Sequence, residues 1–270
     1  MQTLWRQIRR PRIGGEEMPT VFQELSDIHA NARRGEITMI VGQPSAGKSV
    51  VALWHAVQWT MNHPLRGIYW SADTTAFVAA ARTCSMITGM PYPESENALR
   101  ERDPRAMGAL NEITHSGMEW VFDAWIDSDS LTLNMDAFLE KWGAWPDYVI
   151  LDNLTDVDTG QDGDEFSALR GMVRDLNFLI RKSNAAGLIL HHTSESEKDD
   201  PLPPRKAIHG KVSQKPTVIL GTSKGEGEIK PIGPLKNRYG MDNRLGKMAF
   251  EYLFDAEALQ FNGSIGRVLT

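Results

Sequence analysis

The chain has 270 residues, of which 41% are hydrophobic and 24% charged, with a formal net charge of -6. These values are typical of one large globular domain, and the acidic balance excludes a protein that coats DNA by bulk positive charge. No apolar run approaches the roughly 20 residues that cross a membrane, and the arginine-rich N-terminus has no apolar core, which excludes a secretory signal. The single cysteine, Cys84, excludes an internal disulfide and a cysteine-built zinc site, so we expect a cytoplasmic protein.

In chain order, residues 1–19 are expected to form an N-terminal arm and residues 20–270 a single core. Apolar runs and helix-breaking residues predict alternating strands and helices as far as residue 193, followed by strands alone. This order predicts an α/β fold with a mostly parallel sheet, helices on both faces and an antiparallel C-terminal extension. The expected strands are 36–41, 67–72, 120–125, 147–153, 186–193, 217–224, 228–238, 247–253 and 258–262, and the expected helices are 49–63, 77–89, 94–115, 133–144 and 165–184.

The stretch GQPSAGKS, from Gly42 to Ser49, matches the phosphate-loop pattern in full. A predicted strand precedes it and a predicted helix follows it, which is the context that this motif requires. The backbone N–H groups of such a loop surround phosphates, and the helix start adds the positive end of its dipole. We therefore expect ATP to bind at Gly42, Ser45, Gly47, Lys48 and Ser49, with the Ser49 hydroxyl on Mg²⁺.

Asp152 follows four apolar residues at the end of a predicted strand. A phosphate-loop protein needs a carboxylate at such a strand end to hold Mg²⁺. We therefore assign Asp152, together with Ser49, to the expected metal site.

Two cations close to the C-terminus, in the stretch PLKNRYG, have no evident partner. Lys236 and Arg238 point the same way if this stretch is a strand, because alternate strand residues share a face. They are expected to meet an anion, and the phosphate loop is the obvious one. The spacing alone leaves open whether Arg238 reaches its own phosphate loop or that of another copy.

Six stretches in this order resemble the RecA-like motor core of DnaB-type replicative helicases and the related plasmid-replication hexameric ATPases. They begin with ARRGEITMIVGQPSAGKS and GIYWSADTTAFVAAAR, continue with VILDN and LILHHTSE, and end with IHGKVSQKPTVIL and PLKNRYG. The resemblance covers about residues 20–262, nearly the whole chain. It implies a RecA-like phosphate-loop NTPase that assembles into a ring, expected to be a hexamer, and uses ATP and Mg²⁺.

The resemblance also implies roles for individual residues. Arg238 is expected to be an arginine finger for the γ-phosphate of a neighbouring subunit, with Lys236 as its companion. Asp73 takes the place of the family's catalytic glutamate, and His192 that of its sensor glutamine. Arg82 is expected to flank the nucleotide, with a plain position on the helix surface as the equal alternative. The Asp73 carboxylate is one methylene shorter than that of glutamate, which predicts slow hydrolysis.

In the resembling family, loops after the Asp152 strand and after the sensor strand line the central pore of the ring. The second loop here, 193–215, carries the basic residues Arg205, Lys206, Lys211 and Lys215 and has no aromatic residue. We expect an extended loop that contacts the phosphates of single-stranded or forked DNA through charge alone. A solvated surface loop is the alternative.

Three other functions fit the same motifs. Clustered carboxylates at Asp156, Asp158, Asp162, Asp164 and Glu165 could hold a second divalent ion, which suggests a metal-dependent, structure-specific DNA nuclease on the same scaffold. A strand-exchange recombinase would share the core and form filaments. A regulatory ATPase would not respond to DNA.

Overall fold

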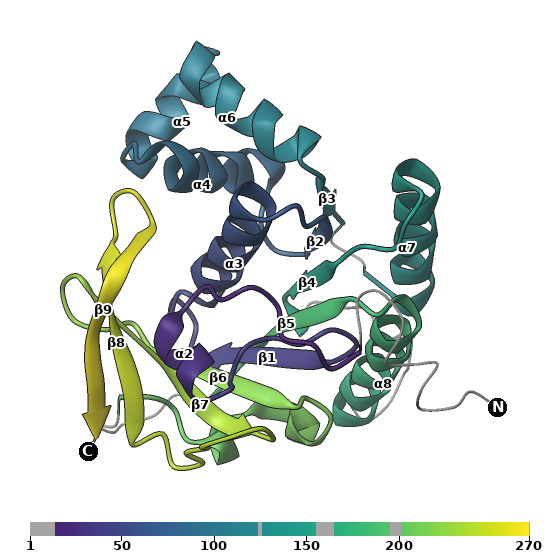
Figure 1. The fold of residues 1–270 in the computed structure, drawn as a ribbon, viewed down its shortest axis with the longest axis vertical. Helices are drawn as coiled ribbons and strands as arrows, with labels where there is room; N and C mark the ends of the chain where they lie inside the picture. Colours follow the sequence, from purple (N-terminus) through teal and green to yellow (C-terminus); the bar gives the residue numbers. More distant parts are fainter. Residues whose placement is uncertain (1–13, 124–125, 155–164, 195–200, 270) are drawn as a thin grey trace.

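The computed structural model describes residues 14–123, 126–154, 165–194 and 201–269. Its single sheet has nine strands in the order β3-β2-β4-β5-β1-β6-β7-β8-β9 (Figure 1). The six strands from β3 to β6 are parallel, whereas β7, β8 and β9 are antiparallel to their neighbours. The predicted parallel sheet with an antiparallel C-terminal extension is therefore confirmed. The strands are β1 (Ile37–Gly42), β2 (Gly67–Ser71), β3 (Met118–Phe122), β4 (Tyr148–Asp152), β5 (Ala186–His192), β6 (Val218–Thr222), β7 (Ile229–Asn237), β8 (Met248–Asp255) and β9 (Gln260–Leu269).

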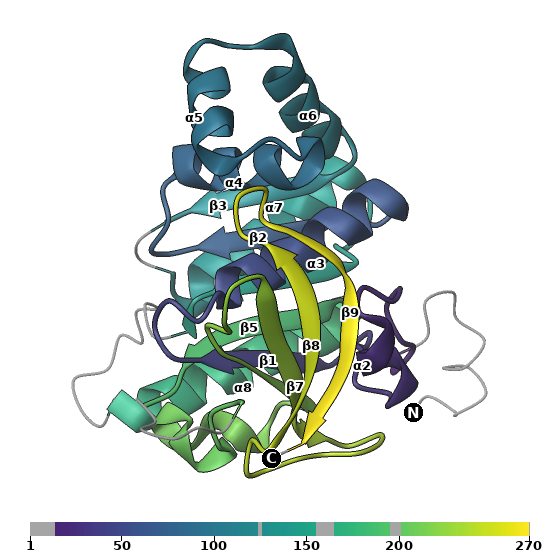
Figure 2. The ribbon, with the colours of Figure 1, turned by 90° about the vertical axis from the view of Figure 1, so that its left-hand side faces the viewer.

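Helices cover both faces of the sheet (Figures 1 and 2). One core lies between the sheet and α3, α4 and α6, and the other lies between the sheet and α7 and α8. Neighbouring residues of β1 serve different cores: Ile40 packs into the first, and Met39 and Val41 into the second. The helices are α2 (Gln23–Asp27), α3 (Lys48–Asn62), α4 (Ala76–Thr88), α5 (Tyr92–Arg100), α6 (Pro104–His115), α7 (Ser128–Trp142) and α8 (Glu165–Ser183).

Local signals fix several helix ends. The Asp127 side chain accepts from the Ser130 backbone N–H at the start of α7, and Gly143 ends that helix in the left-handed conformation. The predicted helical stretch at 94–115 is divided into two helices, α5 and α6. Asp103 caps α6 and Pro104 occupies its first position, where proline starts a helix rather than continuing one.

The loop before β6 also differs from the prediction. In place of an extended loop without an apolar core, residues 205–207 and 209–214 form two 3₁₀ turns. Leu202, Ile208 and Val212 anchor these turns in the core beneath α8. The described half of the loop is therefore folded onto the domain.

The described part of the expected arm contacts the core. The Gly15 and Met18 N–H groups donate to the Arg34 and Ala32 carbonyls, and Met18 is buried. The Trp59 indole N–H donates to the Pro19 carbonyl at 2.9 Å. Within the described residues, no helix combines the length and the apolar character that crossing a bilayer needs.

Candidate nucleotide site

Strand pairing brings residues of the predicted site from four strands to one edge of the sheet. Gly42, at the end of β1, lies opposite His192 at the end of β5. Ser71, at the end of β2, lies opposite Asp152 at the end of β4. Because these strands are parallel, their carboxyl ends meet, and ligands bind there in open α/β sheets.

The phosphate loop between β1 and α3 depends on two glycines. A Cβ at Gly42 would lie 2.6 Å from the Thr222 carbonyl oxygen, so no larger residue fits beside β6. Gly47 has φ +83°, and a Cβ there would lie 2.6 Å from the Lys230 Nζ. Ser45 also has positive φ, at 61°. The loop therefore curls closely around the start of α3.

Lys48 is buried at the mouth of this loop, with 6% of its surface exposed. Its ammonium donates to the Gly42 and Gln43 carbonyls at 3.2 and 3.0 Å and lies 3.2 Å from the His192 Nδ1. Burial lowers the pKa of Lys48, and the charges of Asp152 and Asp73 oppose that shift. Both carboxylates therefore lie close enough to act on Lys48.

The Asp152 carboxylate is held by two hydroxyl groups. Ser49 Oγ donates to Oδ1 at 3.1 Å, and the Tyr69 hydroxyl donates to Oδ2 at 2.7 Å. Burial raises the pKa of Asp152 to about 6, and the two hydrogen bonds partly oppose that shift. A carboxylate beside a hydroxyl oxygen is the donor set that Mg²⁺ prefers, so the predicted metal residues Ser49 and Asp152 are together and fit this ion.

The two histidines at the end of β5 have different surroundings. His191 is fully buried, its Nε2 donates to the His209 carbonyl at 3.0 Å, and burial lowers its pKa to about 4. His192 lies between Lys48 and Asn153, with its Nε2 3.3 Å from the Asn153 Nδ2. Because an ammonium only donates, the His192 Nδ1 is the acceptor in the contact with Lys48. His192 thus links the phosphate-loop lysine to the end of β4.

Asp73 and Arg82 lie on the β2 side of Asp152. Arg82 lines a small cavity together with Ser49, Tyr69, Ser71 and Asp152. Asp73 is exposed two residues beyond β2, and the Thr74 hydroxyl donates to it at 3.2 Å. The structure therefore brings both predicted residues to the site that Lys48, Ser49 and Asp152 form.

Lys236 and Arg238 lie at the opposite edge of the sheet. The Arg238 N–H donates to the Thr217 carbonyl, and the Thr217 N–H donates to the carbonyl of Ile37, the first residue of β1. Arg238 is thus level with the start of β1, whereas the phosphate loop follows its end, about 16 Å away at about 3.3 Å per residue. An arginine side chain does not span that distance.

Both side chains turn toward the loop before β6, as expected for alternate residues. The Lys236 ammonium, 9% exposed, donates to the Ser213, Gln214 and Pro216 carbonyls at 2.9, 3.0 and 2.5 Å. Arg238 is exposed and reaches the Gln214 carbonyl at 3.5 Å. Lys236 therefore stabilises the loop of its own chain before β6, whereas Arg238 is exposed to solvent at this edge.

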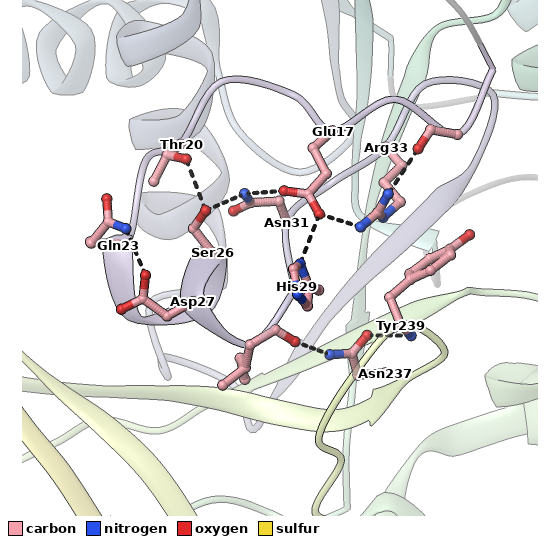
Figure 3. A network of polar contacts seen from close by, with 12 residues as sticks. Glu17, Thr20, Gln23, Ser26, Asp27, His29, Asn31, Arg33, Asn237 and Tyr239 are labelled. Atoms are coloured by element: carbon pink, nitrogen blue, oxygen red, sulfur yellow. Dashed lines mark hydrogen bonds and ion pairs between the residues drawn. The ribbon is translucent and has the colours of Figure 1, made fainter. Parts of the chain in front are cut away.

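The N-terminal segment contacts Asn237 and Tyr239, the two neighbours of Arg238 in the chain, and so braces the backbone there (Figure 3). The Asn237 side chain donates to the Ile28 carbonyl at 2.7 Å and accepts from the Tyr239 N–H at 2.9 Å. The Arg33 guanidinium stacks over the Tyr239 ring, 3.9 Å from its centroid, and pairs with Glu17. Arg238 thus lies between two residues that are tied to residues 17–33.

Of the predicted DNA-contacting residues, Arg205 is partly buried in the first 3₁₀ turn, and Lys206 and Lys215 are exposed. The Lys211 side chain lies outside the described part of the structure, as do residues Asp156, Asp158, Asp162 and Asp164 and the Glu165 side chain. Within the described residues, no group of three or more His, Cys, Asp or Glu side chains is placed to hold a metal ion. The carboxylates of the nuclease hypothesis lie outside the residues that this finding covers.

Residues 18–198 match the model of a protein family described as AAA domain. The chain belongs to this AAA domain family. Its similar relatives include the Gene 65 proteins of two mycobacterial phages. The protein of phage L5 is 25% identical over 257 residues, which cover 92% of this chain and 93% of the relative. The protein of phage D29 is 24% identical over 233 residues, with 84% and 98% covered.

Solved structures that share the fold of this AAA domain include two ATPase-type proteins. The first, described as an ATPase domain, superposes with a TM-score of 0.81 at 17% identity and covers 96% of this chain and 95% of its own. The second, a DnaB-like replicative helicase described with its interactions with primase, gives a TM-score of 0.80 at 17% identity. It covers 96% of this chain, which spans 66% of that helicase. The expected RecA-like fold of DnaB-type ATPase domains is thus confirmed, and the family makes the chain a nucleotide-binding ATPase domain.

Three residues of this AAA domain site were not found from the sequence. Tyr69 and Asn153 flank Asp152 and His192, and Lys230 lies against Gly47. Tyr69 faces Asp152 because β2 pairs with β4, although 83 residues separate the two in the chain. The position of Asn153 directly after Asp152 is a signal that could have found it.

Proposed function

We propose that this AAA domain is the ATP-driven motor of a DnaB-like DNA helicase that works as a closed ring, with six copies as the resemblance implies. ATP and Mg²⁺ bind at Gly42–Ser49 and Asp152 of one copy. The neighbouring copy supplies Arg238. Hydrolysis then moves loops in the pore along single-stranded DNA and separates a fork.

The position of Arg238 carries this proposal. It is exposed and braced, yet about 16 Å along the sheet from its own phosphate loop. In NTPases of this type, an arginine that stabilises the transferred phosphoryl group contributes roughly 10³–10⁵ in rate. A second copy is therefore needed to complete the site. The fold shared with DnaB-like ATPase domains supports the same arrangement.

The remaining site residues have separate roles in this proposal. Asp73 orients the attacking water, because it is an exposed carboxylate whose charge acts on Lys48. His192 accepts from the Lys48 ammonium and is therefore placed to respond when Lys48 turns to the γ-phosphate. Arg82 flanks the nucleotide from the cavity beside Asp152. Lys236 supports the loop before β6 through its three carbonyl contacts.

Mixing two inactive variants tests the ring. Lys48→Ala removes the phosphate-loop lysine, and Arg238→Ala removes the finger. In an equal mixture, about one interface in four combines an intact loop with an intact finger, if the copies mix at random. We expect each variant alone to hydrolyse ATP at background rate and the mixture to regain up to that fraction of wild-type activity.

The control is Arg244→Ala, an exposed arginine near the same turn whose side chain lies 3.6 Å from Asp242. This variant should keep wild-type activity. If the mixture stays inactive although mass spectrometry shows mixed assemblies, Arg238 does not act between copies.

DNA binding is tested through its salt dependence. Lys206 and Lys215 are exposed, and residues 201–217 contain no Phe, Tyr or Trp. Lys206→Ala and Lys215→Ala should each weaken binding of oligo-dT. Each should also make the negative slope of log K against log salt concentration less steep, by about 1. Unchanged slopes in both variants would exclude this loop from the DNA path.

A further inference from the structure

Lys230 lies against the phosphate loop although it belongs to a distant part of the chain. It is the second residue of β7, which runs antiparallel to β6 and so begins at the edge of the sheet where the phosphate loop lies. A Cβ at Gly47 would lie 2.6 Å from its Nζ and 2.8 Å from its Cε. The ammonium group therefore packs on the backbone of the glycine that precedes Lys48.

Four lysine or arginine side chains are buried among the described residues, and three of them have an ion-pair partner or several hydrogen-bond partners. Arg34 pairs with Asp147 at 3.0 Å, Lys48 has two carbonyls and His192, and Lys236 has three carbonyls. Lys230 is 5% exposed, and the structure gives it one acceptor, the Lys224 carbonyl at 3.4 Å. Among the described residues, its ammonium makes one further favourable contact, a cation–π contact with the Phe254 ring, whose centroid lies 5.7 Å from Nζ.

A buried ammonium without a carboxylate partner is unfavourable, and a nearby positive charge makes it more so. Burial lowers the pKa of Lys230 to about 8, and the positive charge of Lys224 adds to that shift. An anion beside Gly47 would offset both the burial of the Lys230 charge and its repulsion by Lys224. The phosphate loop is built to hold such an anion, because its backbone N–H groups surround the phosphates of a nucleotide.

We propose that Lys230 is a second lysine of the same chain that binds the nucleotide, through the α- and β-phosphates. This assignment rests on the proposed function, since it requires a nucleotide in the loop. The backbone of a phosphate loop surrounds the α- and β-phosphates, whereas its lysine reaches the β- and γ-phosphates. A cation packed on Gly47 is therefore placed at the part that ATP and ADP share. Lys230, near the start of β7, then serves the nucleotide site of its own chain, whereas Arg238, directly after the end of β7, serves the site of a neighbouring copy.

Nucleotide titrations of Lys230→Met test this assignment. The probes are ADP and ATP that carry a fluorescent ribose label, followed by anisotropy with and without Mg²⁺. A charge-assisted hydrogen bond contributes about 1.5–3 kcal/mol, so Kd should rise about 10- to 100-fold and by the same factor for both nucleotides. Lys230→Arg should recover most of the affinity. Lys224→Met, which removes the exposed neighbouring lysine, should change Kd less than about threefold.

Thermal unfolding without nucleotide separates a binding role from a structural one. Methionine removes a buried, poorly satisfied charge, so the melting temperature of Lys230→Met should rise by about 2–4 °C. A lysine that the fold needs would give the opposite result. A variant that melts lower, or that fails to fold, therefore contradicts the assignment.

The outcomes also separate this inference from the proposed function. If Lys48→Met abolishes binding and Lys230→Met leaves both Kd values unchanged, the role of Lys230 is refuted and nucleotide binding stands. If Kd rises for ATP alone, Lys230 does not bind the α- and β-phosphates. If the wild-type protein binds neither nucleotide, the proposed function itself is refuted.

Discussion

Asp152→Asn should stabilise the protein without nucleotide while it abolishes hydrolysis. Burial raises the pKa of the Asp152 carboxyl from 3.8 to about 6, so the folded protein holds this proton more tightly than the unfolded chain does. The folded state therefore becomes less stable as pH rises through this range. The full cost is about 3 kcal/mol above about pH 7, because one pKa unit corresponds to about 1.36 kcal/mol. Below about pH 3.8 this loss of folding free energy is absent.

Asparagine keeps the shape of Asp152 and carries no charge. Its amide oxygen can still accept from Tyr69, and its amide nitrogen can donate to the Ser49 oxygen. We therefore expect the free energy of unfolding to increase by up to about 3 kcal/mol near pH 7.5 and by about half as much near pH 5. Hydrolysis should fall to background, because the amide is a poor ligand for Mg²⁺.

Urea denaturation in EDTA at both pH values measures the difference. Asp136→Asn, on an exposed position of α7, is the control and should change stability by less than about 0.5 kcal/mol. The reasoning is refuted if Asp152→Asn is less stable than the wild type near pH 7.5. It is also refuted if the difference does not shrink at the lower pH.

Three further predictions follow from the same contacts. Tyr69→Phe removes a hydrogen bond that lowers the pKa of the Asp152 carboxyl. At limiting Mg²⁺, the rate of ATP hydrolysis is expected to fall as pH drops through about 6, and in rate–pH profiles of this variant the fall should begin at higher pH. Gly47→Ala forces alanine to φ +83° against Lys230, so it should lower the free energy of unfolding by about 1–2 kcal/mol and abolish nucleotide binding in titrations. Asn237→Ala loses the contact with Ile28, so hydrolysis should fall toward that of Arg238→Ala with the nucleotide Kd unchanged.

Controls from the same chain separate strain from function in the last two cases. Gly143 ends α7 with φ +68° and has nothing within 4 Å of its expected Cβ, so Gly143→Ala should cost similar stability and keep nucleotide binding. Asn243→Ala removes a side-chain contact with the Met248 carbonyl near the same turn and should keep hydrolysis. Loss of nucleotide binding in Gly143→Ala, or a weaker Kd in Asn237→Ala, would contradict these explanations.

The sequence predicted those parts of the site whose residues are contiguous. The phosphate loop lies within eight residues, Gly42–Ser49, and Asp152 ends an apolar run, so both could be read from local pattern. Alternating strands and helices likewise predicted a parallel sheet. The strand order decides which side chains meet, and this order does not follow the chain. Tyr69 and Lys230 were missed for that reason.

The loop before β6 was mispredicted for a different reason. Leu202, Ile208 and Val212 anchor it, but they are irregularly spaced among prolines and charged residues. Neither the period of a helix nor that of a strand applies to such spacing. Their burial depends on α8, which packs over the second 3₁₀ turn.

The most direct test of the motor is a forked DNA substrate, end-labelled and incubated with Mg²⁺, with and without ATP, and run on native and denaturing gels. Lys48→Ala is the control. We expect intact single strands, released only when both ATP and Lys48 are present. Shortened strands on the denaturing gel, with or without ATP, would contradict the helicase and identify a nuclease that uses the same fold to hold DNA.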